Sequence, residues 1–303
     1  MTTFSTRRGT LVGATAVLMW ATLATLTTLS GDIPPFQLLA MSFTLATLIG
    51  LAWHRFLNLW LEGGSQVKKP VPLAAWAVGL YGLFGYHFAY FMALRLAPPV
   101  EASLIAYLWP LLIVLFAALL PGERLHGYQV AGALLGFAGA ALLVTRSRGL
   151  TFDAQYAAGY AFALACAVIW SSYSVLSRRL GAVPTSAVGA FCAATAGLAL
   201  VCHLLFEETV WPGGWQWAAV VALGLGPVGA AFYTWDYGVK RGHIQTLGAL
   251  AYAAPLLSTI LLVAMRLAEP SWVIAAACVL IVGGAALASG RGRKEEGSAD
   301  FAD

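Results

Sequence analysis

Long apolar stretches dominate the pattern along the chain, and short segments with Gly, Pro and charged residues separate them. These stretches are too long for strands and do not alternate with a period of two, so we interpret them as helices. A helix needs roughly 20 apolar residues to cross the hydrocarbon core of a bilayer. The pattern predicts an all-α integral membrane protein with ten transmembrane helices, over residues 9–29, 35–56, 72–95, 98–120, 126–144, 157–178, 184–206, 214–240, 244–265 and 269–289.

The composition favours the same class of protein. Hydrophobic residues make up 60% of the 303 residues and charged residues only 10%, whereas soluble domains contain about 25% charged residues. The longest connection between predicted helices, residues 54–70, is too short for a second domain. We predict a single transmembrane domain over residues 1–303, without an attached catalytic or nucleic-acid-binding domain.

The distribution of positive charge predicts the orientation. If successive connections alternate between the two sides of the membrane, thirteen of the 17 Lys and Arg residues fall on the side of both termini. Loops rich in Lys and Arg stay in the cytoplasm, so we expect cytoplasmic N- and C-termini in the inner (plasma) membrane of a bacterium. Arg146 and Arg148 run against this rule, and the sequence offers no account of them.

The chain contains two similar halves, about residues 9–145 and 157–290, followed by a polar tail at 291–303. Matching segments are AVLMW at 16–20 with CAVIW at 166–170, YLWPLL at 107–112 with YAAPLL at 252–257, and GAAL at 139–142 with GAAL at 284–287. Five helices begin on one side of the membrane and end on the other, so the second half must be inverted relative to the first. Inverted five-helix repeats are typical of carriers that work by alternating access, with the substrate site near the midplane between the halves.

Several segments resemble the drug/metabolite transporter superfamily (EamA-type carriers). They are ALRLAPPVEASLI at 93–105, PLL at 110–112, PGERL at 121–125 and QVAGALLGFAG at 129–139. Within the superfamily, GYHFAY at 85–90 and YLWP at 107–110 are most similar to the bacterial aromatic amino-acid exporters. The resemblance implies a ten-helix exporter with both termini inside. The second half departs from the pattern at RLAEP, residues 266–270, so no role is carried over to Glu269.

Aromatic residues at midplane depth are the first candidates for a substrate site. Trp20 and Trp170 lie about halfway along their helices and at matching positions of the two halves. We expect them to line a central cavity, with Tyr173 as a neighbour, although core packing is an alternative use of large rings.

His87 lies inside an apolar span, where ionisable groups usually face a cavity or the bundle interior. Tyr86 and Tyr90 share its side of the helix. We expect all three to contact substrate; the alternative is a neutral imidazole bonded to a nearby hydroxyl or carbonyl.

Prolines mark a further pair of candidate segments. Pro110 can bend its helix and so bring both Tyr107 and Trp109 toward the cavity. Tyr252 beside Pro255 is the equivalent in the second half.

Charged residues give possible gating or coupling groups. Asp236 and Lys240 are spaced for a local ion pair, with a gating or coupling carboxylate as the alternative for Asp236. Glu123 lies in a cytoplasmic turn, where we expect a structural or gating role. Arg95 and Glu101 are expected to pair with each other or to extend toward water.

No nucleotide-binding, metalloprotease, nucleophile or haem motif occurs, so we expect no catalytic residue, metal or cofactor. Gly132 and Gly136 are spaced for close packing of two helices. We expect a monomer in the lipid bilayer whose small-molecule substrate is flat and amphipathic, an aromatic amino acid or a related metabolite. A carrier of cationic drugs or other metabolites remains an alternative, because aromatic faces also attract cations. A channel or a membrane-embedded enzyme fits the residues less well.

Overall fold

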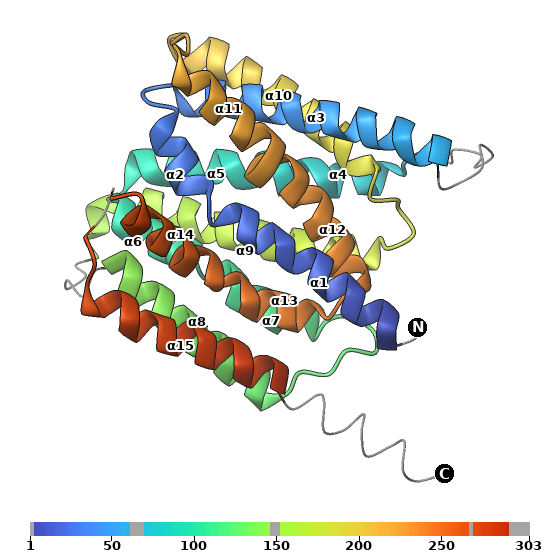
Figure 1. The fold of residues 1–303 in the computed structure, drawn as a ribbon, viewed down its shortest axis with the longest axis vertical. Helices are drawn as coiled ribbons and strands as arrows, with labels where there is room; N and C mark the ends of the chain where they lie inside the picture. The colour runs from blue at the N-terminus through green and yellow to red at the C-terminus, as the bar shows by residue number, and fades with distance from the viewer. Residues whose placement is uncertain (1–2, 61–69, 146–151, 267–268, 291–303) are drawn as a thin grey trace.

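The computed structural model describes residues 3–60, 70–145, 152–266 and 269–290, and among these residues there are helices but no strand (Figure 1). Arg146, Arg148 and the predicted tail at 291–303 lie outside them. The elements in chain order are α1 (Thr3–Trp20), α2 (Leu23–Leu29), α3 (Pro35–Trp60), α4 (Leu73–Leu80), η1 (Tyr81–Gly85), α5 (Tyr86–Leu96), α6 (Pro99–Ala106), α7 (Trp109–Ala117), α8 (Gly127–Thr145), η2 (Ala154–Tyr156), α9 (Ala157–Arg179), α10 (Ala187–Phe206), α11 (Trp215–Leu225), η3 (Gly226–Ala230), α12 (Ala231–Arg241), α13 (Ile244–Ala251), α14 (Ala253–Ala264) and α15 (Trp272–Gly290).

Most of these elements join into helices of membrane-spanning length. The described residues contain nine stretches that are long and apolar enough to cross a bilayer, from Thr6–Leu29 to Ile244–Ala264. The last predicted range, 269–289, covers α15 except for its last residue, and the apolar part of this helix, Trp272–Ala288, is shorter. The protein is therefore all-helical in its described residues, with nine candidate membrane spans.

Two of the predicted helices are interrupted next to a proline. α6 ends at Ala106 before α7, and α13 ends at Ala251 before α14. Pro110 and Pro255 each lack the amide hydrogen that would bond the carbonyl four residues earlier, and those carbonyls belong to Ala106 and Ala251. The helix is thus interrupted beside Pro110, where the sequence predicted a disturbance.

Two further helices each contain one π-helical segment that the apolar pattern did not reveal. η1 joins α4 to α5 and η3 joins α11 to α12, and η3 begins 145 residues after η1. Short π-helical segments inside α-helices occur frequently at functional sites. Here both lie at matching positions of the two sequence repeats.

The helices pack in pairs that follow the repeat. α1 lies along α12 as α9 lies along α5, while α3 packs on α10 and α8 on α15 (Figure 1). Close packing of α8 on α15 depends on glycine: a Cβ atom on Gly132 would collide with the carbonyl oxygen of Gly284. On Gly136 it would collide with the ring of Tyr252. The close packing predicted for Gly132 and Gly136 is therefore confirmed.

The two ends of the bundle are named by the chain segments that lie there. α1 begins beside the end of α12, where Gly9 packs on the backbone of Arg241 and Gly242. We call this end the N-terminal face. The other end, where α3 begins and α10 ends, is the opposite face (Figure 1).

Candidate functional site

Four tryptophan rings meet in the interior of the bundle. Trp20 ends α1, Trp109 begins α7, Trp170 lies in α9 and Trp235 lies in α12. Every pair among them has ring centroids 5.0 to 6.4 Å apart. Trp109, Trp170 and Trp235 are buried. These four residues, two from each sequence repeat, are the tryptophan tetrad.

A second group of rings extends from the tetrad toward α5. Phe232 lies 5.7 Å from Trp170 and stacks on Phe43 with centroids 5.5 Å apart. The imidazole of His87 meets Phe43 edge-on at 5.4 Å, and the ring of Tyr86 lies 5.3 Å from Trp170. Aromatic pairs at such distances contribute about 0.5–1.5 kcal/mol each beyond the area they bury.

Further predicted tyrosines join or border this group. Tyr90 stacks on Tyr86 with centroids 6.2 Å apart, and both rings pack against the buried cluster that contains Ala106, the residue before Tyr107. Tyr173 is buried, with its ring 5.2 Å from that of Trp170. Ring contacts thus join every predicted substrate-site residue except Tyr107 and Tyr252 into one connected group.

The two π-helical segments each supply a backbone carbonyl to this group. Nδ1 of His87 lies 2.7 Å from the carbonyl oxygen of Leu83 in η1. The indole nitrogen of Trp20 donates to the carbonyl of Pro227 in η3 at 3.1 Å. Because a carbonyl accepts only, Nδ1 carries a proton, and in the neutral imidazole Nε2 is left as an acceptor. This bond is the carbonyl contact considered above as the alternative, and it orients His87 without using Nε2.

Tyr252 lies elsewhere. It is fully buried in a separate cluster with Val114, Leu256 and Ile281. Its hydroxyl accepts a hydrogen bond from the amide of Leu111 at 3.1 Å, in the first turn of α7, where amides lack a partner within the helix. Tyr252 therefore positions the helix that carries Trp109, and we leave it out of the candidate substrate site.

An ion pair lies beside the tetrad, toward the N-terminal face. Nζ of Lys240 is 2.8 Å from the carboxylate of Asp236, and the two side chains are 8% and 3% exposed. The hydroxyl of Thr185 donates to Asp236 at 2.7 Å, and Lys240 donates to the carbonyl of Val183 at 3.0 Å. The local pair predicted from the spacing is confirmed, and it also ties α12 to the segment between α9 and α10.

A second polar network closes the same face. Arg178, in the last turn of α9, forms an ion pair with Glu123. Its other nitrogen donates to the carbonyls of Val239 and Gly242 at 3.0 and 2.6 Å. Gln245 donates to Glu123 at 2.8 Å. Glu123 thus connects the α7–α8 segment to α9 and α13.

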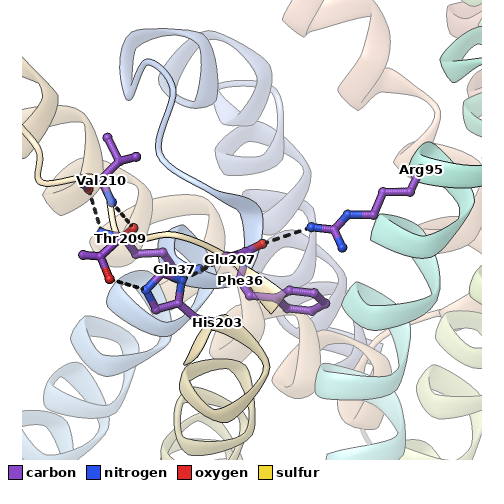
Figure 2. A network of polar contacts seen from close by, with 7 residues as sticks. All are labelled: Phe36, Gln37, Arg95, His203, Glu207, Thr209 and Val210. Atoms are coloured by element: carbon purple, nitrogen blue, oxygen red, sulfur yellow. Dashed lines mark hydrogen bonds and ion pairs between the residues drawn. The ribbon is translucent and has the colours of Figure 1, made fainter. Parts of the chain in front are cut away.

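The opposite face is held by a carboxylate at the start of α3 (Figure 2). The side chain of Glu207 is 2% exposed and accepts the amides of Phe36 and Gln37, both at 3.0 Å. A negative charge at a helix N-terminus interacts favourably with the helix dipole and satisfies free amides. Arg95 approaches Glu207 at 3.6 Å and its side chain is 45% exposed. Of the two expectations for Arg95, extension toward water therefore agrees with the structure, and its ion pair is formed with Glu207 in the second half of the chain.

Three further residues, His203, Thr209 and Val210, complete this network in Figure 2. Nδ1 of His203 lies 3.1 Å from Glu207, and its Nε2 lies 2.9 Å from the hydroxyl of Thr209. The side chain of Gln37 exchanges hydrogen bonds with the backbone of Val210 at 2.7 and 2.9 Å. Together these bonds fix the start of α3 against the end of α10.

Trp235, Phe232 and Glu207 were not among the residues predicted from the sequence. Trp235 stands beside Asp236 near a helix end, a position typical of an interfacial tryptophan. Its depth follows from the length of α12 and the packing of that helix on α1. Among the described residues, no group of three His, Cys, Asp or Glu side chains could hold a metal ion.

The chain matches the EamA-like transporter family model twice, over residues 7–145 and 157–290. It is 57% identical over 281 residues to the aromatic amino acid exporter YddG of Ancylobacter novellus, an alignment that covers 92% of this chain and 96% of that protein. The exporter of the same name in Escherichia coli is 22% identical over 289 residues, 93% of this chain and 96% of that protein. A crystal structure of a protein 56% identical superposes with a TM-score of 0.87, covering 93% of this chain and 98% of that one. The chain belongs to the EamA-like transporter family.

Proposed function

We propose that this protein exports aromatic amino acids and related flat, amphipathic metabolites across the inner membrane of a bacterium. The relatives that align over almost their whole length are aromatic amino acid exporters. The observation that carries the proposal is the tryptophan tetrad, because its four rings come from both halves of the chain and meet in the bundle interior.

The substrate ring would enter between rings of the tetrad. Indole and phenyl side chains stack favourably on aromatic faces. His87 adds a polar contact at the edge of this site, since Nε2 can accept a hydrogen bond from a substrate ammonium group. Tyr86, Tyr90, Tyr107 and Tyr173 extend the aromatic wall.

Alternating access supplies the mechanism that we propose. The chain would form ten membrane spans as two inverted repeats with both termini cytoplasmic. In support, exchanging the repeats converts the α1–α12 pair into the α9–α5 pair, and returns α3–α10 and α8–α15 to themselves. Carriers with inverted repeats expose a fixed central site by moving one helix bundle against another.

The polar networks at the two faces would act as gates. Glu123 with Arg178, and Asp236 with Lys240, close the N-terminal face, which is cytoplasmic in this orientation. Arg95 with Glu207 joins the two halves at the other face. A monomer contains all of these parts.

Transport into inverted membrane vesicles tests the proposed function. Labelled tryptophan and phenylalanine should accumulate in vesicles that contain this protein, and threonine, which has no ring, should not. Ethidium tests the alternative that the tetrad serves organic cations. Accumulation of neither aromatic amino acid would overturn the proposal.

A further inference from the structure

The ion pair of Asp236 and Lys240 is buried inside the bundle. Both side chains are less than a tenth exposed. Removing two charges from water is costly, and apolar residues in place of such a pair often leave the free energy of unfolding unchanged or raise it. Stability therefore gives a weak reason for two charges at this depth, which points to a role in recognition.

The pair is next to the proposed aromatic site. Asp236, Lys240 and Tyr173 line one small cavity of about 10 Å³. Tyr173 in turn lies 5.2 Å from Trp170 of the tetrad, and Trp235 directly precedes Asp236 in α12. The ring of Tyr173 thus borders both the cavity of the two charges and the tetrad.

The two charges match the two charges of an amino acid. A free amino acid carries an ammonium and a carboxylate group on one carbon atom, and in the aromatic amino acids one methylene joins this carbon to the ring. A ring stacked in the tetrad therefore leaves the charged groups within reach of its immediate surroundings, and Asp236 and Lys240 are found there.

We propose that Asp236 and Lys240 bind the α-ammonium and α-carboxylate groups of the exported amino acid. The ammonium group takes the place of Lys240 at the Asp236 carboxylate, while the substrate carboxylate takes the place of Asp236 at Lys240. Two buried ion pairs then replace one, and no buried charge is left without a partner. Because the internal pair must separate, substrate entry also opens the link between α12 and the α9–α10 segment.

This inference rests on the proposed function, and ligands with one charge removed test it separately. Phenylalanine carries both charges, phenethylamine only the ammonium and 3-phenylpropionate only the carboxylate. Their dissociation constants can be measured by equilibrium dialysis of radiolabelled ligand against the purified full-length protein in nanodiscs. The wild-type protein should bind phenylalanine at least about tenfold more tightly than either analogue, because hydrogen bonds to charged groups are the strong ones.

Single substitutions that remove one charge test which group of the ligand each side chain binds. Asp236→Asn should weaken the binding of phenylalanine and phenethylamine about tenfold or more but should not weaken that of 3-phenylpropionate, because Lys240 is then free of its internal partner. Lys240→Gln should weaken the binding of phenylalanine and 3-phenylpropionate and should not weaken the binding of phenethylamine. Glu123→Gln is the matched control, because it removes one charge of the Glu123–Arg178 ion pair, which we do not place at the substrate. It should change the dissociation constants of all three ligands by the same factor.

The double variant Asp236→Asn with Lys240→Gln guards against misfolding, since it leaves no unpaired buried charge. In it, phenylalanine should lose its advantage over both analogues. If the Asp236 and Lys240 variants weaken the binding of all three ligands equally, or leave the binding of phenylalanine unchanged, the proposal is overturned while the aromatic site stands. If the wild-type protein binds neither phenylalanine nor tryptophan, the proposed function fails as well.

Discussion

The indole ring of Trp20 lies 5.0 Å from that of Trp235, although the two residues belong to different halves of the chain. Trp20 ends the first half of a broken helix, at the point where α1 stops before α2. Trp235 reaches the same point because α12 packs along α1. A ring contact across the two halves makes the centre of the bundle sensitive to their relative movement.

Substitution of Trp170 should weaken transport without preventing membrane insertion. Its ring contacts Trp20, Trp109 and Trp235, and each aromatic pair is worth about 0.5–1.5 kcal/mol. Trp170→Ala should therefore raise the KM for tryptophan at least about tenfold in inverted vesicles, and Trp170→Phe should raise it less. Trp215→Ala is the control, since Trp215 is 89% exposed; equal KM values for the Trp170 variants and wild type would contradict a substrate role for the tetrad.

The roles of the two ring nitrogen atoms of His87 can be tested separately. Asn at position 87 keeps a donor for the Leu83 carbonyl, which His87 contacts at 2.7 Å, but has no atom at the position of Nε2. His87→Asn should keep the thermal stability of the protein in detergent and lower uptake of phenylalanine about tenfold, whereas His87→Ala should lower both. Wild-type uptake by both variants would show that the imidazole serves only packing.

Glu207 should contribute to stability through the start of α3. Glu207→Gln removes the charge that two amides and Arg95 share, and loss of a hydrogen bond to a buried charged group costs about 1.5–3 kcal/mol. We expect the variant to have a lower midpoint of thermal unfolding. This midpoint can be measured by size-exclusion chromatography of heated samples. Glu208→Gln, at the neighbouring exposed position, should leave the midpoint unchanged, and identical midpoints for both variants would refute this role.

Arg178 should hold the N-terminal face closed. It bonds Glu123 and the carbonyls of Val239 and Gly242, so Arg178→Gln releases three acceptors at once. Amide hydrogen exchange at the end of α12 and the start of α13 should become faster by about tenfold or more, as expected when local opening becomes easier by about 1.4 kcal/mol. Arg179→Gln, at an exposed position next to it, serves as control. Unchanged amide hydrogen exchange in the Arg178 variant would contradict a role of Arg178 in holding this face closed.

Packing of α8 on α15 should tolerate no side chain at Gly132. A methyl group there collides with the Gly284 carbonyl, whereas a methyl group on Gly283 meets nothing within 4 Å. Gly132→Ala should reduce the yield of folded protein several-fold, because a rigid backbone atom must move. Gly283→Ala should express normally, and equal yields of the two variants would contradict so close an approach of the two helices.

The apolar pattern located the helices well because length and hydropathy are local properties of the chain. The predicted ranges 35–56 and 184–206 contain α3 and α10 almost entirely. The same reasoning could not find η1 and η3, since a π-helical segment inside an apolar run changes the hydrogen bonding and leaves the hydropathy unchanged. Prolines did reveal the breaks before α7 and α14, because a missing amide hydrogen is also a local property.

The repeat pointed to two residues of the tryptophan tetrad but did not reveal that Tyr252 lies outside it. Trp20 and Trp170 occupy matching positions, and both belong to the tetrad. Tyr252 matches Tyr107 equally well, yet it caps α7 from a separate cluster. The two halves share a backbone arrangement but carry different side chains, and the same position can then serve packing in one half and the central site in the other.

The sequence by itself determined that this protein is a helical membrane protein of two similar halves, because apolar runs, charge and repeats can be read along the chain without knowledge of its folding. Only the tertiary structure decided which aromatic residues meet. Trp20 and Trp235 are brought together by helix packing across the halves, as are Arg95 and Glu207. Partners so distant in the chain are selected by the shape and depth of whole helices, and no local pattern contains that information.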